Sequence, residues 1–134
     1  MPICVGPFTG ICDANIAAWM SQRLATDGSS PDFLYWVTLN SHLPVPVPPP
    51  LKDGASCTFS ASLAESSSLC SWYQLVANVH HSAADLALGK ENRPTVFVIV
   101  GDHAPPFSET GLRGGFSPDS VPYILLTPRS SGTR

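Results

Sequence analysis

The sequence predicts an α/β fold whose sheet is mostly parallel. Two apolar runs rich in β-branched or aromatic residues, residues 33–38 and 95–100, have the composition of strands. Between them, in residues 69–88, apolar side chains recur at helical spacing. A strand, a helix and a second strand in this order form a crossover unit, in which the two strands run parallel when they share a sheet.

Composition limits the classes of protein to which the chain can belong. It has 134 residues, of which 43% are hydrophobic and 13% charged, so it can bury a core as one domain or part of one. A net charge of -3 argues against nucleic-acid binding, which requires a basic face. The longest apolar run is far shorter than the ~20 residues of a transmembrane helix, and the chain does not open with a signal-peptide pattern. We therefore expect a chain that is soluble as given, without a membrane segment.

Two helices and a last strand complete the predicted elements. Asp13 is a candidate N-cap for a first helix over about residues 14–24. Its apolar face would consist of Ile16, Trp19, Met20 and Leu24. The second helix is the crossover segment. The strand over residues 95–100 is the central strand. A Gly-rich loop over residues 111–115 and a short strand over residues 121–127 follow it.

The central strand leads directly into residues that can bind a metal. Its length and apolar composition are typical of a strand covered on both faces. Gly101 then allows the backbone to leave strand geometry, so that Asp102 and His103 can turn toward one ion. Two prolines follow, and because they lack an N–H they cannot continue the sheet.

The loop after residues 33–38 carries a second histidine, His42. Because the C-terminal ends of parallel strands lie at the same edge of a sheet, we expect His42 to lie within roughly 10 Å of Asp102 and His103. Two imidazoles and a carboxylate suit Zn²⁺, and Mn²⁺ where oxygen ligands complete the shell.

Four cysteines allow three disulfide connectivities. The local pairs Cys4–Cys12 and Cys57–Cys70 are the most economical, and they would indicate an oxidising compartment. The alternative is four buried free thiols, because cysteine is also a common core residue in reduced proteins.

Two stretches together resemble a known family. Tyr-Trp-Val-Thr-Leu-Asn-Ser-His-Leu-Pro (residues 35–44) and Val-Ile-Val-Gly-Asp-His-Ala-Pro-Pro-Phe (residues 98–107) are similar to the C-terminal half of the catalytic domain of sulfatase-like enzymes in the alkaline phosphatase superfamily. The similarity is greatest to the membrane-anchored bacterial branch that includes phosphoethanolamine transferases and lipoteichoic acid synthases. The resemblance implies a partial alkaline-phosphatase-like α/β/α sandwich, with residues 1–134 as the C-terminal segment of a single catalytic domain.

The resemblance also implies roles for individual residues. The family's paired metal ligands fall on Asp102 and His103, and its substrate-binding histidine falls on His42, which would also hold or protonate the departing group. Asn40 beside it would contact substrate. Arg113 is either an anion contact or a solvated loop residue. The implied cofactor is a divalent metal, Zn²⁺ or Mn²⁺, with Mg²⁺ and Ca²⁺ as further candidates.

The sequence is compatible with two functions. The family hydrolyses or transfers sulfate or phosphate esters with a Thr, Ser or formylglycine nucleophile and a further carboxylate ligand, and neither can be identified in this sequence. Residues 4–7 do not fit the formylglycine signature Cys-x-Pro-x-Arg. The parent protein would act on an anionic ester, of a lipid or a polysaccharide, in the periplasm or on the extracytoplasmic face of the membrane. The alternative is a non-catalytic sulfatase-like domain that binds a glycan or a protein partner.

Overall fold

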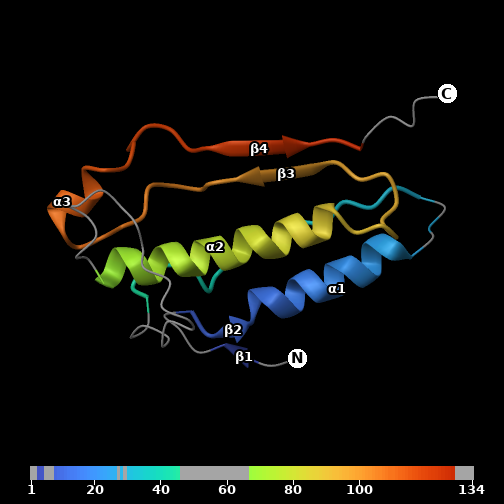
Figure 1. Ribbon diagram of the computed structural model, residues 1–134, viewed down its shortest axis with the longest axis horizontal. Coiled ribbons are helices and arrows are strands. Elements are labelled where there is room, and N and C mark those ends of the chain that lie inside the picture. Colours follow the sequence, from blue (N-terminus) through green and yellow to red (C-terminus); the bar gives the residue numbers. More distant parts are fainter. Residues whose placement is uncertain (1–2, 5–7, 27, 29, 46–66, 129–134) are drawn as a thin grey trace.

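The chain forms a mixed α/β structure in which two long helices lie side by side next to a two-stranded sheet (Figure 1). The computed structural model describes residues 3–4, 8–26, 28, 30–45 and 67–128. Its elements, in chain order, are β1 (Ile3–Cys4), β2 (Gly10–Ile11), α1 (Asp13–Ala25), α2 (Ser67–Ala87), β3 (Phe97–Val100), α3 (Thr110–Arg113) and β4 (Tyr123–Leu126). In the described part of the chain, no helix combines the length and the apolar character needed to cross a membrane.

The two predicted long helices are confirmed, with bounds that differ by one or two residues at each end. Their shared core contains Ala17, Met20 and Leu24 of α1 and Leu86 of α2. Phe97 of β3 packs against the same cluster. Trp19, which was expected on the buried face, is 46% exposed, because the buried stripe of α1 follows Asp13, Ala17, Met20 and Leu24 instead. The helices therefore cover β3 on the face that carries Phe97, whereas β4 is exposed along its whole length.

The predicted parallel sheet covered on both faces is wrong for the part of the chain that the structure describes. The central strand β3 pairs with β4, and the pairing is antiparallel. Val98 and Val100 of β3 are 62% and 58% exposed, so the helices cover only one face. A continuous apolar run indicates burial only when a second layer exists to cover the other face.

Residues 31–39 are extended but form no strand ladder, which corrects the predicted strand over residues 33–38. This segment nevertheless runs in the same direction as the chain through β3. Asp32 at the beginning of the segment binds Arg93, and His42 just after its end contacts His103. The two residues of each pair are separated by the same number of positions along the chain, as expected for two segments that run in the same direction. The crossover therefore aligns the two segments in parallel without the hydrogen bonds of a parallel sheet.

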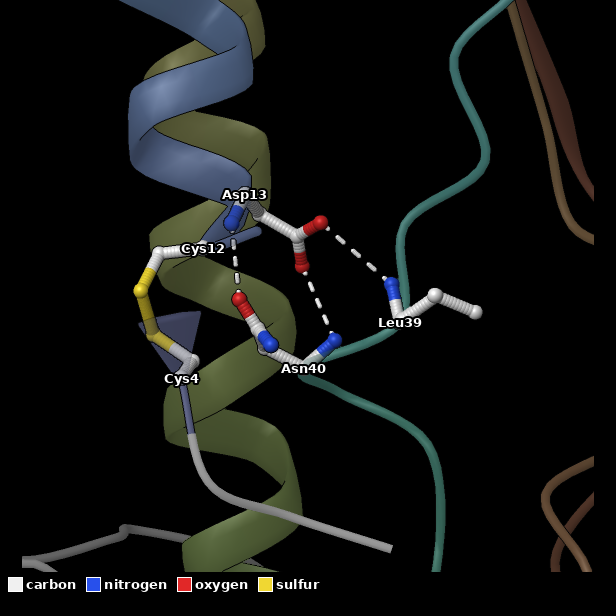
Figure 2. Close-up of a disulfide and its surroundings, with 5 residues drawn as sticks. All are labelled: Cys4, Cys12, Asp13, Leu39 and Asn40. Carbon is white, nitrogen blue, oxygen red and sulfur yellow. Dashed lines mark hydrogen bonds between the residues drawn. A yellow bond between two sulfur atoms is a disulfide. The ribbon is translucent and has the colours of Figure 1, made fainter. Parts of the chain in front are cut away.

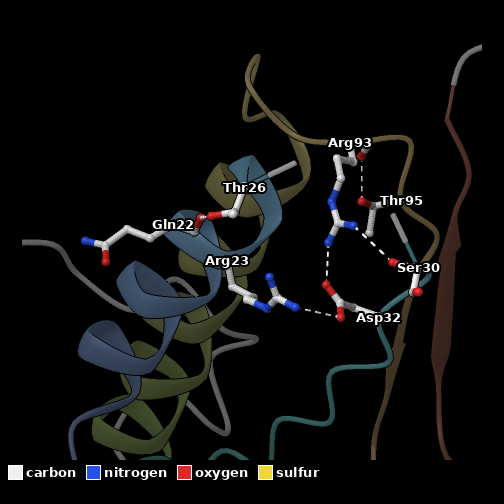
Figure 3. A network of polar contacts seen from close by, with 7 residues as sticks. All are labelled: Gln22, Arg23, Thr26, Ser30, Asp32, Arg93 and Thr95. Carbon is white, nitrogen blue, oxygen red and sulfur yellow. Dashed lines mark hydrogen bonds and ion pairs between the residues drawn. The ribbon is translucent and has the colours of Figure 1, made fainter. Parts of the chain in front are cut away.

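A cluster of charged side chains fixes the beginning of this alignment (Figure 3). The carboxylate of Asp32 accepts a hydrogen bond from Arg93 and a second from Arg23 Nη2, at 2.8 Å. The backbone N–H of Arg93 also donates to the carbonyl oxygen of Leu24, at 3.1 Å. The hydrogen bond from Arg93 and the charges of both arginines lower the pKa of Asp32.

We expect Asp32→Asn to remove part of the acid sensitivity of the fold. A carboxyl group whose folded-state pKa is lowered stabilises the protein above its unfolded pKa of 3.8, and this contribution is lost as the pH falls through the folded value. Thermal unfolding from neutral pH down to about pH 2 should therefore show a steeper loss for the wild type than for the variant. Asp119→Asn, at an exposed position, is the control. Equal pH profiles for wild type and Asp32→Asn would contradict the role of this carboxylate.

The short strands β1 and β2 pair antiparallel beside a disulfide at the beginning of α1. The disulfide joins Cys4 to Cys12, with the two Cα atoms 4.9 Å apart. Cys70 is also disulfide-bonded, and its expected partner Cys57 lies outside the described residues. A short loop closed by a disulfide restricts the unfolded chain and so stabilises the fold, by about 2–3 kcal/mol for a loop of this size.

Candidate functional site

Two loops meet at one end of the molecule, and each contains a histidine that the sequence singled out. The first follows the extended segment 31–39, and the second follows β3. Leu43 of the first loop and Phe107 of the second are 9% and 3% exposed and belong to one hydrophobic cluster, together with Leu69 of α2 and Leu112 of α3. This cluster holds the two loops against each other, so the positions of their polar residues are linked.

The structure brings His42 and His103 into contact. Their ring centroids are 5.9 Å apart and their planes make an angle of 78°. The ring of Phe8 also contacts His42, with a centroid distance of 4.7 Å. His42 is half-buried, whereas the side chain of His103 is 52% exposed. The proximity expected from the crossover is therefore present.

Both imidazoles are oriented by backbone carbonyl groups of their own loops. His103 Nδ1 lies 2.8 Å from the carbonyl oxygen of Ala104, and His42 Nδ1 has the same relation to the carbonyl oxygen of Leu43. A carbonyl oxygen can only accept a hydrogen bond, so Nδ1 carries the proton in both rings. In the neutral form, Nε2 of each ring then keeps its lone pair. Histidine ligands of metals are typically oriented in this way, through a hydrogen bond from the other ring nitrogen.

Asp102 lies next to the other ring nitrogen of His103, Nε2. A favourable contact between the two requires a proton or a cation between them, because a carboxylate oxygen and an unprotonated ring nitrogen can both only accept. Its Oδ2 atom is 3.3 Å from His103 Nε2, and its Oδ1 accepts the backbone N–H of His103 at 2.9 Å. Gly101 precedes this turn and donates its N–H to the carbonyl oxygen of Pro122, at 3.0 Å. A Cβ atom at Gly101 would lie 3.2 Å from Pro122 Cδ, so the glycine permits a close approach of the two backbones. Asp102 and His103 thus present an oxygen and a nitrogen donor at one point on the surface.

The donors are chemically suited to a divalent metal, but the set is small. A carboxylate oxygen and imidazole nitrogens match Zn²⁺ or Mn²⁺. Among the described residues, however, no group of three or more His, Cys, Asp or Glu side chains is arranged to hold a metal ion. Asp102 and His103 could therefore contribute two ligands, with His42 as a neighbour of the site.

Asn40 has a structural partner that the sequence did not reveal (Figure 2). Its side-chain Oδ1 accepts the backbone N–H of Asp13 at 2.7 Å. In return, the carboxylate of Asp13 accepts the backbone N–H groups of Asn40 and Leu39, at 3.0 and 3.3 Å. The amide oxygen of Asn40 is thus used to attach the His42 loop to α1.

Asp13 is the residue near the site that the sequence analysis missed. It was expected to cap its own helix, but it is the first residue of α1, and Cys12 occupies the N-cap position without a side-chain hydrogen bond. Only 6% of Asp13 is exposed, because its carboxylate faces the loop that leads to His42. An acidic residue at the start of a predicted helix was a usable signal, but nothing in the sequence indicated its long-range partners.

Arg113 ends α3, a short helix in the stretch expected to be a Gly-rich loop. The helix contributes Leu112 to the cluster beneath the site and lies at the same end of the molecule as the loop after β3 (Figure 1). Arg113 itself is exposed. Its position is compatible with both expectations, an anion contact and a solvated residue.

An open hollow of about 210 Å³ borders the two loops. It is lined by Leu43, Pro44, Val45, Ser68, Pro106, Phe107, Ser108 and Glu109. Ligand pockets for small molecules typically have volumes of about 300–1,000 Å³, so this hollow would hold a small group or part of a larger ligand. Its apolar lining comes from the residues that directly follow His42 and the Asp102–His103 pair.

Comparison with known proteins adds no relative. No protein-family model, no curated protein and no solved structure matches this chain.

Proposed function

We propose that this chain is the C-terminal part of a sulfatase-like catalytic domain of the alkaline phosphatase superfamily, which hydrolyses or transfers a sulfate or phosphate ester with a divalent metal. The observation that supports this most directly is the geometry of three side chains. His42 and His103 are in contact, both have Nδ1 bound to a carbonyl oxygen, and Asp102 lies beside His103 Nε2. The two motifs that resemble the family are the two loops that carry these side chains.

Each residue has a role in this proposal. Asp102 and His103 would hold the ion, Zn²⁺ or Mn²⁺ by preference and Mg²⁺ or Ca²⁺ as further candidates. Such an ion acts as a Lewis acid on ester oxygens. In its doubly protonated form, His42 would hold or protonate the departing oxygen through Nε2–H, because its Nδ1–H is already bound to a carbonyl oxygen. The Asn40 NH₂ group and Arg113 would contact the anionic group of the substrate.

The remaining parts of the reaction would come from outside the described residues. The nucleophile and a further carboxylate ligand belong to an earlier part of the family's domain, so this chain carries only part of an active site. The finer architecture that we propose is an α/β/α sandwich. Residues 31–42 and the chain through β3, which already run parallel, would be part of a larger sheet in the whole domain. The substrate would be an anionic ester of a lipid or polysaccharide, and the parent would be a membrane-anchored protein acting in the bacterial periplasm or at the cell envelope.

A non-catalytic binding domain is the second candidate. The absence of an identifiable nucleophile in the sequence favours it, and so does the hollow, whose lining residues include Ser68, Ser108 and Glu109. Hydroxyl and carboxylate groups next to apolar side chains suit a sugar or a polypeptide segment. In this case the same fold would bind a glycan or protein partner without catalysing a reaction.

We expect the isolated chain to bind metal weakly and to turn over no ester. Two protein ligands leave most of the coordination shell to water, whereas a tight zinc site normally has four protein ligands. Calorimetric titration of Zn²⁺ and Mn²⁺ should show shallow binding to the wild type, weakened about 10-fold or more by Asp102→Asn. Asp119→Asn removes a similar exposed carboxylate elsewhere on the surface and should bind as the wild type does.

Assays with an aryl phosphate and an aryl sulfate complete the experiment. If metal uptake survives Asp102→Asn unchanged, the ligand assignment is wrong. If the wild type turns over either ester and the substitution abolishes this activity, the site is more complete than we propose.

A further inference from the structure

The sheet has one face that no described residue covers, and we call it the outer sheet face. In an antiparallel pair, directly opposed residues point to the same side, and Val98 opposes Leu125 while Val100 opposes Tyr123. The extended segment beside β3 alternates in the same way, with Phe33 and Tyr35 exposed and Leu34 and Trp36 packed against the helix core. The outer sheet face comprises Phe33, Tyr35, Val37, Val96, Val98, Val100, Tyr123 and Leu125.

These side chains are far more exposed than apolar residues normally are. Phe33, Tyr35 and Tyr123 are 89%, 82% and 73% exposed. None of the eight carries a charge. Their exposed apolar area is on the order of 1,000 Å², whereas the largest apolar patch on a typical monomer covers about 300–600 Å². A patch of this size is typical of an interaction surface.

We propose that a second copy of this chain packs against the outer sheet face in a two-fold symmetric dimer. A stable standard-size interface buries about 800 Å² on each partner, so the face of one copy supplies enough area. A two-fold axis places the same surface on both sides of the contact. Because the face has no charge, its self-association would bury no unpaired ion, and packed sheets lie about 10 Å apart with their side chains interdigitated.

The arrangement of residues within the face fits this partner. Valines of β3 form its middle row, and aromatic side chains stand on both flanking segments. The hydroxyl groups of Tyr35 and Tyr123 would then lie toward the rim, where they can contact water while the rings pack, as tyrosine commonly does at interfaces. This inference depends only on exposure and strand register, not on the proposed metal site. It concerns the chain as given, in which no described helix covers the outer sheet face; in the proposed parent sandwich a second helical layer would take the place of the partner copy.

Sedimentation equilibrium on the full chain tests the proposal. The wild type should have a mass twice its 14.2 kDa. Val98→Lys places a charge in the middle of the contact, twice per dimer, and should raise the dimer dissociation constant at least about 100-fold. Leu88→Lys introduces the same charge at a position that is 79% exposed and lies outside the face, so this variant should dimerise as the wild type does.

A second substitution and a folding control keep the result interpretable. Tyr35→Lys changes a side chain that is 82% exposed in one copy, so it should leave the monomer folded and still weaken the dimer. Circular dichroism and thermal unfolding should show that each variant keeps its helices.

A wild type that stays monomeric at high micromolar concentration would overturn the proposal and favour a helical layer or another protein as the occupant of the outer sheet face. Equal weakening by Leu88→Lys and Val98→Lys, or open-ended aggregation that neither Val98→Lys nor Tyr35→Lys reduces, would overturn it as well.

Discussion

Phe107→Ala should lower the free energy of unfolding by about 3–5 kcal/mol, the usual cost of removing a fully buried aromatic side chain. Phe107 is 3% exposed, which makes it the most buried apolar residue that the structure describes. Its ring packs against Trp72 and Phe116, with centroid distances of 5.7 and 5.9 Å. Alanine would leave a cavity among these rings, and the loss should appear in urea denaturation monitored by tryptophan fluorescence.

The same substitution should also loosen the candidate site. Phe107 and Leu43 belong to one cluster, and each lies within a few residues of a site histidine. Loss of the ring should therefore weaken the contact between His42 and His103, which nuclear Overhauser effects between the two imidazoles can measure. Phe107→Leu, which retains most of the volume, should have a smaller effect on both readouts.

Leu88→Ala is the matched control for stability, because Leu88 is 79% exposed and surface substitutions usually change stability by less than about 0.5 kcal/mol. A loss below about 1 kcal/mol for Phe107→Ala would show that the cluster does not support the two loops.

The sequence predicted the helices and the meeting of the two loops because both follow from local patterns. Apolar residues at helical spacing predict α1 and α2 without knowledge of any partner. The crossover predicts that the ends of residues 33–38 and 95–100 lie together, and the contact between His42 and His103 agrees with this. Neither step depends on the identity of the neighbouring layer.

The sheet was predicted less well because its pattern has two explanations. The run from Thr95 to Val100 is apolar at every position, which indicates a strand covered on both faces. The structure covers only the face with Phe97 and leaves Val98 and Val100 exposed. An apolar residue on a strand shows that burial is favourable but not which element provides it. For the same reason the sequence could not distinguish a covered sheet from one with a free interaction surface.

Long-range polar contacts were the least predictable part of the site. The carboxylate of Asp13 binds backbone N–H groups of residues 39 and 40, and any sequence supplies such groups. Nothing in a residue type indicates that its backbone will be the partner of a distant side chain. The tautomers of His42 and His103 depend in the same way on the path of each loop, since the acceptors are carbonyl groups of the next residue.

Asp13→Asn should destabilise the fold by about 2–3 kcal/mol, because it leaves a buried donor without an acceptor. The wild-type carboxylate offers one oxygen to each of two backbone N–H groups, of Leu39 and Asn40. The amide of asparagine has only one oxygen, and its NH₂ group would face an N–H donor. A negative charge at the N-terminus of α1, worth about 0.3–1 kcal/mol, would also be lost.

The effect of Asp13→Asn should be local to the loop that carries His42. Hydrogen exchange at the amides of Leu39 and Asn40 should accelerate more than exchange in the middle of α2, and the imidazole contact between His42 and His103 should weaken. Asp85→Asn, on the exposed surface of α2, makes the same chemical change without a buried partner and should leave stability and exchange within error of the wild type. If the two variants behave alike, the buried carboxylate does not position the loop. If Asp13→Asn lowers stability but leaves the two amides protected and the imidazoles in contact, Asp13 stabilises α1 alone, and the position of His42 must depend on the hydrophobic cluster around Leu43 and Phe107.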